Sequence, residues 1–246
     1  MRLVRLAVAA LVVPTILHAQ GFAPDSLRNI KVLPRTMTPR EVVGVMRGVA
    51  GALGVRCQYC HVGQEGQPLT QFDFASDDKP TKVKARIMFQ MVQAINGQHL
   101  SQLATRETPP IEVTCQTCHR GVAVPRPLGD VLQAAVQGGG LDSAVRAYRA
   151  LRERYYGRAA YDFGEFTLIG VTQPLTRDRR FDEALGLLRL NAEFYPQSSQ
   201  TQTSMGEVFR TKGDTASAIA AYRQALQLNP NDGGARQRLR DLGQQP

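Results

Sequence analysis

The chain has 246 residues, of which 43% are hydrophobic and 21% charged, and tryptophan is absent. This is the composition of an ordinary globular protein, with the length of one large or two modest domains. The formal net charge of +9 favours acidic partner proteins or anionic membrane faces, although a basic surface without a particular partner fits equally well. Nucleic acid is excluded as a partner by the export signal described next.

Residues 1–19 predict a secretory signal peptide. Arg2 and Arg5 form a charged head, the apolar run from Leu6 to Leu17 follows, and the segment ends at Ala19. Removing this segment leaves a net charge of +7; if it is not cleaved, it would serve as a short membrane anchor. No cysteine follows the apolar run to accept a lipid. We therefore expect a periplasmic protein, with association at the outer face of the inner membrane left open.

Residues 20–35 are predicted as an N-terminal arm, and a helix is expected after it. Thr38 offers an N-cap, Pro39 suits the first helical position, and Gly54 is expected to end the helix at about Leu53. Apolar residues fall at three- and four-residue steps and form one face: Val42, Val45, Met46, Val49 and Leu53. That face must cover something, and the motif that follows suggests what.

A Cys-x-x-Cys-His pentad follows this helix and occurs again later in the chain. The pentads use all four cysteines and are Cys57, Cys60 and His61 in the first copy, and Cys115, Cys118 and His119 in the second. This pattern is the attachment signature of a c-type haem, in which two thiols bond the porphyrin and the imidazole ligates the iron. We predict two covalently attached haem c groups, which agrees with export.

Three other interpretations of the pentads are less suitable. Paired cysteines also bind zinc, but 54 residues separate Cys60 from Cys115, whereas a zinc ribbon has roughly 15 to 20. A thioredoxin-like redox pair does not explain a histidine directly after both second cysteines. Structural disulfides suit an exported protein but leave both histidines unexplained.

Between the pentads we expect a polar loop at residues 62–78, anchored by Phe72 and Phe74, and then a helix from Pro80 to about Thr105. Asp77 and Asp78 precede the proline as N-terminal signals. Apolar residues span about half of the helical wheel, a width suited to a buried helix. They are Val83, Ile87, Met88, Met91, Val92, Ala94 and Ile95.

Each predicted haem needs a second axial ligand, and the chain lacks the histidines to supply two. Apart from His18 in the signal, His99 is the only histidine outside the pentads. Methionine is the natural alternative, since a thioether favours the ferrous state and raises the potential. Met46, 11 residues before Cys57, is the candidate for the first haem. Met88 and Met91 are both candidates for the second, since periodicity does not choose between them. Ordinary core packing is the alternative role for each of these methionines.

After the second pentad, Pro125 and Pro127 and then Gly138, Gly139 and Gly140 indicate a domain boundary, and a linker is predicted at 128–140. Residues 141–246 then show a tetratricopeptide pattern, with two to two and a half repeats and a capping helix from about Asp232 to Leu242. Ala184 and Ala218 occupy equivalent positions 34 residues apart. Such repeats bind a protein or peptide client, or they pack against the haem domain and extend its core.

At this point a resemblance becomes specific. Residues 31–127 resemble the cytochrome c subunit of photosynthetic reaction centres. The motifs that carry it are Thr38-Pro39-Arg40-Glu41 before Met46, both pentads, Ala85-Arg86-Ile87-Met88-Phe89-Gln90-Met91 with Ala94-Ile95-Asn96, and Val113-Thr114 with Arg120-Gly121 around the second pentad. The resemblance implies Met46 as ligand of the first haem and Met88 as ligand of the second, with Met91 as the fallback.

The chain also departs from that family. The family subunit binds four haems, and this chain resembles only its first half. His99 lies three residues closer to Met88 than the family's histidine that reaches a further haem, so it is a vestige, a surface residue or a ligand to another chain's haem. The repeat tail is foreign to the family subunit. These departures bear more on the identity of the partner than on the haem assignments.

The predicted fold is therefore mainly α. A dihaem c-type cytochrome domain at 36–127 is built from repeated helix-turn-CxxCH units, and an α-helical tetratricopeptide domain follows at 141–246. The predicted function is non-enzymatic electron transfer to redox partners at a membrane, for example a reaction centre. Two alternatives remain: a haem-containing scaffold or redox-sensing assembly factor that binds a client, and a dihaem peroxidase-like enzyme in which a methionine leaves the iron.

Overall fold

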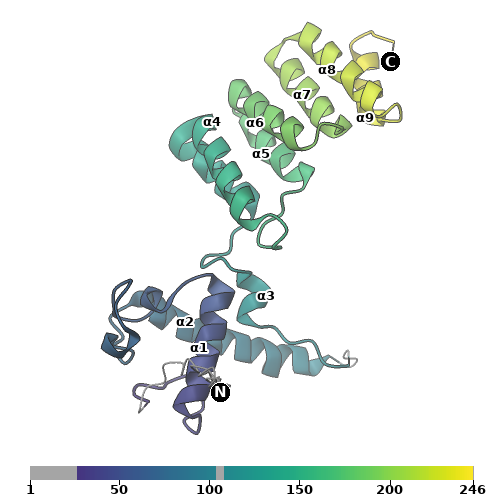
Figure 1. Cartoon of the computed structure of the whole chain (residues 1–246). Coiled ribbons are helices and arrows are strands. Elements are labelled where there is room, and N and C mark those ends of the chain that lie inside the picture. The colour runs from purple at the N-terminus through teal and green to yellow at the C-terminus, as the bar shows by residue number, and fades with distance from the viewer. Residues whose placement is uncertain (1–26, 104–107, 246) are drawn as a thin grey trace, which may run out of the picture. The chain divides into compact units, whose positions relative to one another are not determined.

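The computed structural model describes residues 27–103 and 108–245, and these are mainly α-helical, as predicted (Figure 1). The predicted signal peptide and residues 20–26 of the arm lie outside the described residues. The chain divides into two compact units, which we call unit 1 (residues 1–48 and 56–107) and unit 2 (residues 49–55 and 108–246). Across the described ranges, no helix combines the length and the hydropathy required to span a bilayer.

Helix α1 (Pro39–Leu53) has the predicted bounds. The N–H of Thr38 donates to Glu41 Oε2 at 2.7 Å and the N–H of Glu41 donates to Thr38 Oγ1 at 3.3 Å, which forms a capping box. At the other end the N–H of Val55 donates to the carbonyl of Ala50 at 3.0 Å. Gly54 has φ of 65°, a left-handed conformation that favours glycine at a helix end.

The loop after the first pentad folds back through an isolated bridge between Val62 and Asp73. It contains a short 3-10 turn, η2 (Leu69–Gln71). Phe72 and Phe74 stack with ring centroids 5.6 Å apart, and Gly63 leaves room for the Phe72 ring, since a Cβ there would lie 2.6 Å from it. The two phenylalanines therefore hold this loop together, and their predicted anchoring against the haem domain stays a prediction.

Helix α2 (Pro80–Ala94) begins where predicted but with a different cap. Its N-cap is Lys79, which makes no side-chain cap hydrogen bond, so the expected capping by Asp77 or Asp78 is wrong. Asp77 instead forms ion pairs with basic side chains from the arm and from α2. Helical turns continue as the π segment η3 (Ile95–His99) and the 3-10 turn η4 (Leu100–Gln102). The expected end at Thr105 lies outside the described residues.

The apolar arc of α2 is not buried, contrary to expectation. Four of its seven residues are exposed: Val83, Ile87, Met88 and Met91. The reason is that the neighbouring segments of unit 1 contact the polar side of the helix. Asn29, Val32 and the loop at 74–77 hydrogen-bond or pair with Lys82, Arg86 and Gln93.

In unit 2, helix α4 (Leu128–Tyr155) includes residues 128–140, so the segment predicted as a linker is helical. Gly139 and Gly140 break its geometry, with φ of 68° at Gly140. Leu128, Leu132 and Val136 are nearly fully buried in the main apolar core of the unit. Their four-residue spacing is a helical pattern that the neighbouring prolines and glycines obscured.

Five further helices follow and pack side by side in chain order (Figure 1). They are α5 (Glu165–Arg177), α6 (Phe181–Phe194), α7 (Ser199–Lys212), α8 (Thr215–Leu228) and α9 (Gly233–Asp241). Ala184 and Ala218 are fully buried in α6 and α8. Gly206 admits the Tyr222 ring, because a Cβ at this position would lie 2.4 Å from it. The tetratricopeptide assignment stays a prediction.

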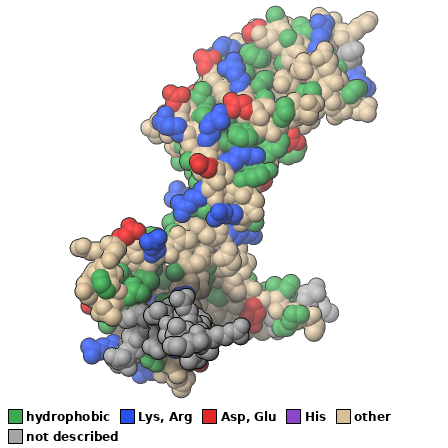
Figure 2. Space-filling view, in the orientation of Figure 1, with side chains coloured by type: hydrophobic (Ala, Val, Ile, Leu, Met, Phe, Trp, Pro, Cys, Tyr) green, Lys and Arg blue, Asp and Glu red, His purple; other side chains and the backbone are tan. Residues whose placement is uncertain are grey.

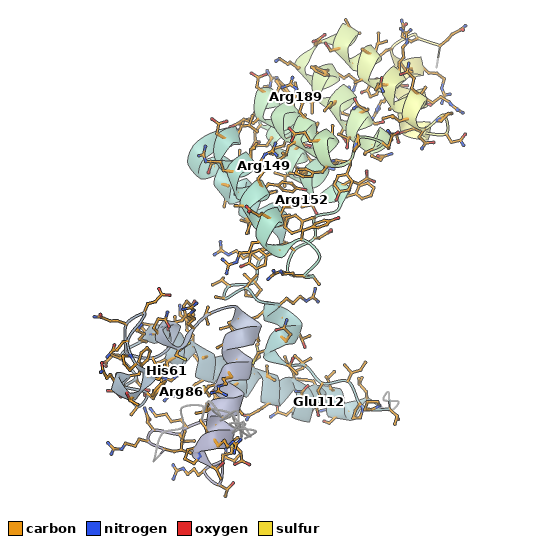
Figure 3. The ribbon with its side chains drawn as sticks, viewed as in Figure 1. His61, Arg86, Glu112, Arg149, Arg152 and Arg189 are labelled. Carbon is orange, nitrogen blue, oxygen red and sulfur yellow. The ribbon has the colours of Figure 1, made fainter. Side chains whose placement is uncertain are left out.

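An arginine and several aromatic side chains join α4 to α6. The Arg152 guanidinium lies 4.0 Å from the Tyr156 ring centroid and 4.3 Å from that of Phe194 (Figure 3). Such cation–π contacts favour an arginine between two rings. On the face shown in Figure 2, basic and acidic side chains are interspersed over the helices of unit 2.

Candidate functional site

The first pentad lies in unit 1 and begins as a 3-10 turn, η1 (Cys57–Tyr59). The N–H groups of Cys60 and His61 both donate to the Cys57 carbonyl, at 3.2 and 3.0 Å. In a 3-10 turn the side chains at i and i+3 eclipse each other. The turn therefore places the two cysteines on one side, where both can reach the same ligand, and the histidine follows directly.

Lys79 and Thr81 from the start of α2 secure this turn. The Lys79 ammonium donates to the Gln58 carbonyl, and the Thr81 hydroxyl donates to the Tyr59 carbonyl at 2.5 Å. Burial raises the pKa of the Cys60 thiol. All four cysteines are free thiols.

His61 is partly buried against the loop that precedes α2. Its ring lies 4.9 Å from that of Phe74 in an edge-on arrangement. Burial lowers the pKa of His61 to about 4, and the nearby cations Lys82 and Arg86 act in the same direction. The imidazole is therefore neutral at pH 7, the form that ligates a metal.

Met46 lies on α1 and also belongs to unit 1. Its side chain is half-buried on the predicted apolar face, where Val42 is fully buried. The structure thus groups Met46 with the first pentad in one compact unit. Its role as an iron ligand stays a prediction.

The second pentad forms α3 (Cys115–His119) in unit 2. The N–H of Thr114 donates to Thr117 Oγ1 at 3.0 Å, which secures the start of this short helix. Arg120 then adopts a left-handed conformation with φ of 49°, and the N–H of Gly121 donates to the Ala52 carbonyl at 2.8 Å. This hydrogen bond ties the second pentad to the last turn of α1.

The His119 ring is oriented by the backbone. Its Nδ1 lies 2.9 Å from the Val122 carbonyl oxygen. A carbonyl only accepts, so Nδ1 carries the proton and Nε2 keeps a free lone pair. This is how metal-binding histidines are commonly held, with the outer nitrogen fixing the tautomer and the ring orientation.

The candidate ligands for the second haem lie in unit 1, whereas the second pentad lies in unit 2. Met88 and Met91 are both exposed on α2, so exposure does not choose between them. The pairing of Met88 with His119 stays a prediction. His99 is exposed at the end of η3, and its role also stays a prediction.

The donor set fits two c-type haems. Each pentad combines two free thiols on one helical turn with a histidine that is neutral or has a free Nε2. An exposed apolar stripe on α2 carries two methionines and is suited to contact with a flat apolar group. Within the described residues, no group of three or more His, Cys, Asp or Glu is placed to hold a bare metal ion.

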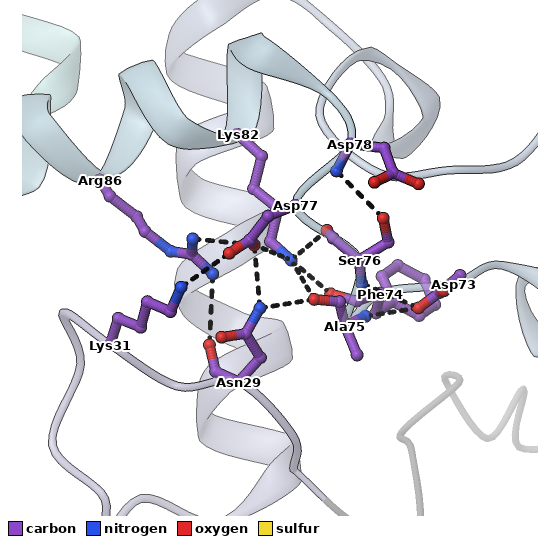
Figure 4. A network of polar contacts seen from close by, with 10 residues as sticks. All are labelled: Asn29, Lys31, Asp73, Phe74, Ala75, Ser76, Asp77, Asp78, Lys82 and Arg86. Atoms are coloured by element: carbon purple, nitrogen blue, oxygen red, sulfur yellow. Dashed lines mark hydrogen bonds and ion pairs between the residues drawn. The ribbon is translucent and has the colours of Figure 1, made fainter.

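Sequence reasoning missed the polar network around Lys82, Asp77 and Arg86 (Figure 4). Lys82 and Arg86 of this network act on the charge of His61. One signal was present, because Lys82 places a cation in the first turn of α2. There the helix dipole disfavours positive charge by about 0.3–1 kcal/mol. A lysine at that position needs another source of stabilisation, and the loop at 74–77 supplies it.

Comparison with known proteins gives one family and several relatives. The family described as "Photosynthetic reaction centre cytochrome C subunit" matches residues 5–144. The photosynthetic reaction center cytochrome c subunit of Thermochromatium tepidum is 37% identical over 107 residues, which are 42% of this chain and 23% of that protein. The corresponding subunit of Rubrivivax gelatinosus is 33% identical over 107 residues, 42% of this chain and 25% of that protein.

Cytochrome c-554 of Chloroflexus aurantiacus is 33% identical over 91 residues, 37% of this chain and 20% of that protein. The chain therefore spans about a quarter or less of the length of these relatives. The family match ends at residue 144, so it leaves α5 to α9 outside the likeness.

Proposed function

Because the chain belongs to the photosynthetic reaction centre cytochrome c subunit family, we propose that it is an exported electron carrier with two covalently attached haem c groups. The observation that best supports this proposal is the orientation of His119. Its Nδ1 donates to the Val122 carbonyl at 2.9 Å and leaves Nε2 for iron, directly after two free cysteines. A haem held there would supply reversible one-electron chemistry.

Each pentad has the same division of roles. Cys57 and Cys60 would bond the first porphyrin, and His61 and Met46 would ligate its iron. Cys115 and Cys118 would bond the second porphyrin, and His119 and Met88 would ligate its iron. Burial keeps His61 neutral, and the Val122 carbonyl fixes the tautomer of His119, so the chain prepares each imidazole before a haem is attached.

With a histidine and a methionine on each iron, no position would remain for oxygen or peroxide, so the proposal includes no catalysis. The family membership supports a membrane-associated redox partner, such as a reaction centre, outside the cytoplasm. The proposed domains are a haem domain at 36–127 and a tetratricopeptide domain at 141–246. The proposal includes a protein or peptide client on the second domain, where the exposed Phe166 side chain of α5 offers an apolar contact.

The proposal is tested by a redox titration of the full chain, expressed in a strain that matures c-type cytochromes. Mass spectrometry and haem staining should show two covalently attached haems. The measured mass should also show that the mature chain begins after the signal peptide. Substitution of Met46 or Met88 by leucine should remove one methionine-to-iron charge-transfer band, whereas M91L, the matched control on the same helix, should leave both bands.

Three results would contradict parts of this proposal. Absence of covalent haem would exclude the carrier as a whole. Loss of a charge-transfer band in M91L and not in M88L would identify Met91, one helical turn further on, as the methionine ligand of the second haem. Peroxide turnover that displaces a methionine would identify the peroxidase-like alternative.

A further inference from the structure

The first turn of α2 buries a cation next to the first pentad. Lys82 is only 8% exposed, and its ammonium donates to three successive carbonyls, those of Phe74 (2.9 Å), Ala75 (3.0 Å) and Ser76 (2.6 Å). A fourth contact joins Nζ to Asp77 Oδ1 at 3.2 Å (Figure 4). Lysine usually keeps its ammonium in water, because removing it from solvent is costly unless other partners replace the water. The loop at 74–77 supplies those partners.

The charges around Lys82 do not cancel. Asp77 also pairs with Lys31 at 2.7 Å and with Arg86 at 2.8 Å, so one carboxylate faces three cations. Among the described residues, the other carboxylate that contacts this part of the loop belongs to Asp73, whose Oδ1 accepts from the N–H groups of Ala75 and Ser76 at 2.9 Å each. The cluster of Lys31, Asp77, Lys82 and Arg86, called here the Lys82 cluster, therefore carries a net positive charge.

This charge acts on the histidine of the first pentad. Phe74, whose carbonyl binds Lys82, places its ring 4.9 Å from the ring of His61. Lys82 and Arg86 both disfavour a positive charge on the imidazole, in addition to its burial. Water screens charges poorly between partly buried groups such as Lys82 and His61, so the same charges would act on any metal that His61 ligates.

We infer that Lys82 and Asp77 set the reduction potential of the haem at the first pentad, with Lys82 raising it and Asp77 lowering it. The inference rests on the proposed function, since it requires a haem at His61. Ferric iron carries one positive charge more than ferrous iron, so a fixed neighbouring cation favours the ferrous form and a carboxylate favours the ferric form. Lys82 and Asp77 are positioning residues, because they act through the loop and through His61.

The test is a spectroelectrochemical titration of the full-length haem protein in four variants. K82M removes the buried charge at similar length, and K82R restores it. D77N removes the carboxylate while keeping its size. K84M is the matched control, because Lys84 is an exposed residue of the same helix and forms no ion pair among the described residues, yet its replacement changes the net charge equally. The same variants are also made in a C115S/C118S background, in which only the first haem remains, so that the redox transition can be assigned to that haem.

K82M and D77N should move the midpoint potential of the haem at the first pentad in opposite directions. At the ambient potential of the wild-type midpoint, K82M should lower the ferrous-to-ferric ratio several-fold and D77N should raise it. K82R should return it towards wild type, whereas K84M and the second haem should not change. If K82M does not accumulate, the direction of the potential shift in D77N still tests the inference, because this substitution leaves the three hydrogen bonds from Lys82 to backbone carbonyls in place.

Other outcomes separate this inference from the proposed function. Suppose that both haems are attached, but K82M and D77N leave the midpoint potential of the first haem unchanged or move it in the same direction. This result would overturn the inference and leave the carrier function intact. A wild-type chain without covalent haem would overturn both.

Discussion

The two pentad histidines are prepared for the proposed iron ligation by different physical routes. Burial and neighbouring cations lower the pKa of His61 to about 4, so its imidazole is neutral at pH 7. His119 is instead oriented by its hydrogen bond to the Val122 carbonyl, which fixes the proton on Nδ1. The first route depends on a loop distant in sequence, and the second on a residue three positions away. The first site is therefore the one whose electrostatics a single distant residue can change.

Asp77 gives a pH dependence of stability that can be measured. Its hydrogen bonds with Arg86, Lys31, Asn29 and Lys82 hold its pKa well below the usual range. A carboxylate whose folded pKa is lowered stabilises the fold above its unfolded pKa of about 3.9 and loses that contribution as the pH falls further. The stability difference between wild type and D77N should therefore be constant above pH 5 and should shrink between pH 4 and pH 2. Chemical denaturation at several pH values measures it.

Asp78 provides the control for this prediction. It is the adjacent carboxylate, it is exposed, and the described residues give its side chain no ion pair. D78N should follow the wild-type stability profile throughout. A D77N difference that stays constant down to pH 2 would show that the ion pairs of Asp77 do not contribute to folding.

At the scale of the element, α1 was predictable from its own sequence because its signals are local. The Thr38 cap, Pro39 at the first position and Gly54 at the end all act within one turn of the helix boundary. The start of α2 was not, since Asp77, three residues before Pro80, binds Lys31, which lies 46 residues away in the sequence. Local propensity identifies where helices begin and end, but it does not identify which polar side chains will bind residues distant in sequence instead of capping a helix.

The same distinction applies to the candidate site. The pentads are contiguous in sequence, so their cysteines and histidines could be identified before the structure. Lys82 could not, because its role depends on three carbonyls brought to it by the fold of the loop at 74–76. The burial of α2 was mispredicted for the related reason that periodicity defines an apolar face without saying what covers it.

The contact between the end of α1 and the second pentad requires glycine at Gly54. Its φ is 65°, and a Cβ there would lie 2.1 Å from the carbonyl oxygen of Gly121. G54A should therefore destabilise unit 2 by about 2 to 4 kcal/mol, as the sum of left-handed strain and a lost hydrogen bond between Gly121 and Ala52. The free energy of unfolding from denaturant titration measures this.

Gly44, within the same helix, is the matched control. It is exposed, and a Cβ added there meets nothing within 4 Å. G44A should stabilise the helix by about 0.5–1 kcal/mol, because alanine loses less backbone entropy than glycine on folding. Equal effects of the two substitutions would show that the close approach of Gly54 to Gly121 does not exist in solution.

At the scale of the whole molecule, the two pentads belong to different units, each with its own supports. The first is secured by side chains from the start of α2, and the second by the N–H of Gly121 on the carbonyl of Ala52. Helix α1 contributes to both units, since residues up to Gly48 belong to unit 1 and Val49–Val55 to unit 2. One helix thus carries the candidate ligand of the first haem and holds the turn of the second.

This arrangement predicts that the two proposed haems attach independently. The local hydrogen bonds of each pentad arise within its own unit, so replacing Cys57 and Cys60 by serine should leave the second haem in place, and replacing Cys115 and Cys118 should leave the first. Each double variant should lose the mass of one haem and roughly halve the haem absorbance per polypeptide. Because serine is nearly isosteric with cysteine and the turns keep their backbone hydrogen bonds, the apoprotein region should stay helical by circular dichroism. Loss of both haems from either variant would mean that attachment at one pentad depends on the other, and that α1 transmits the defect between the units.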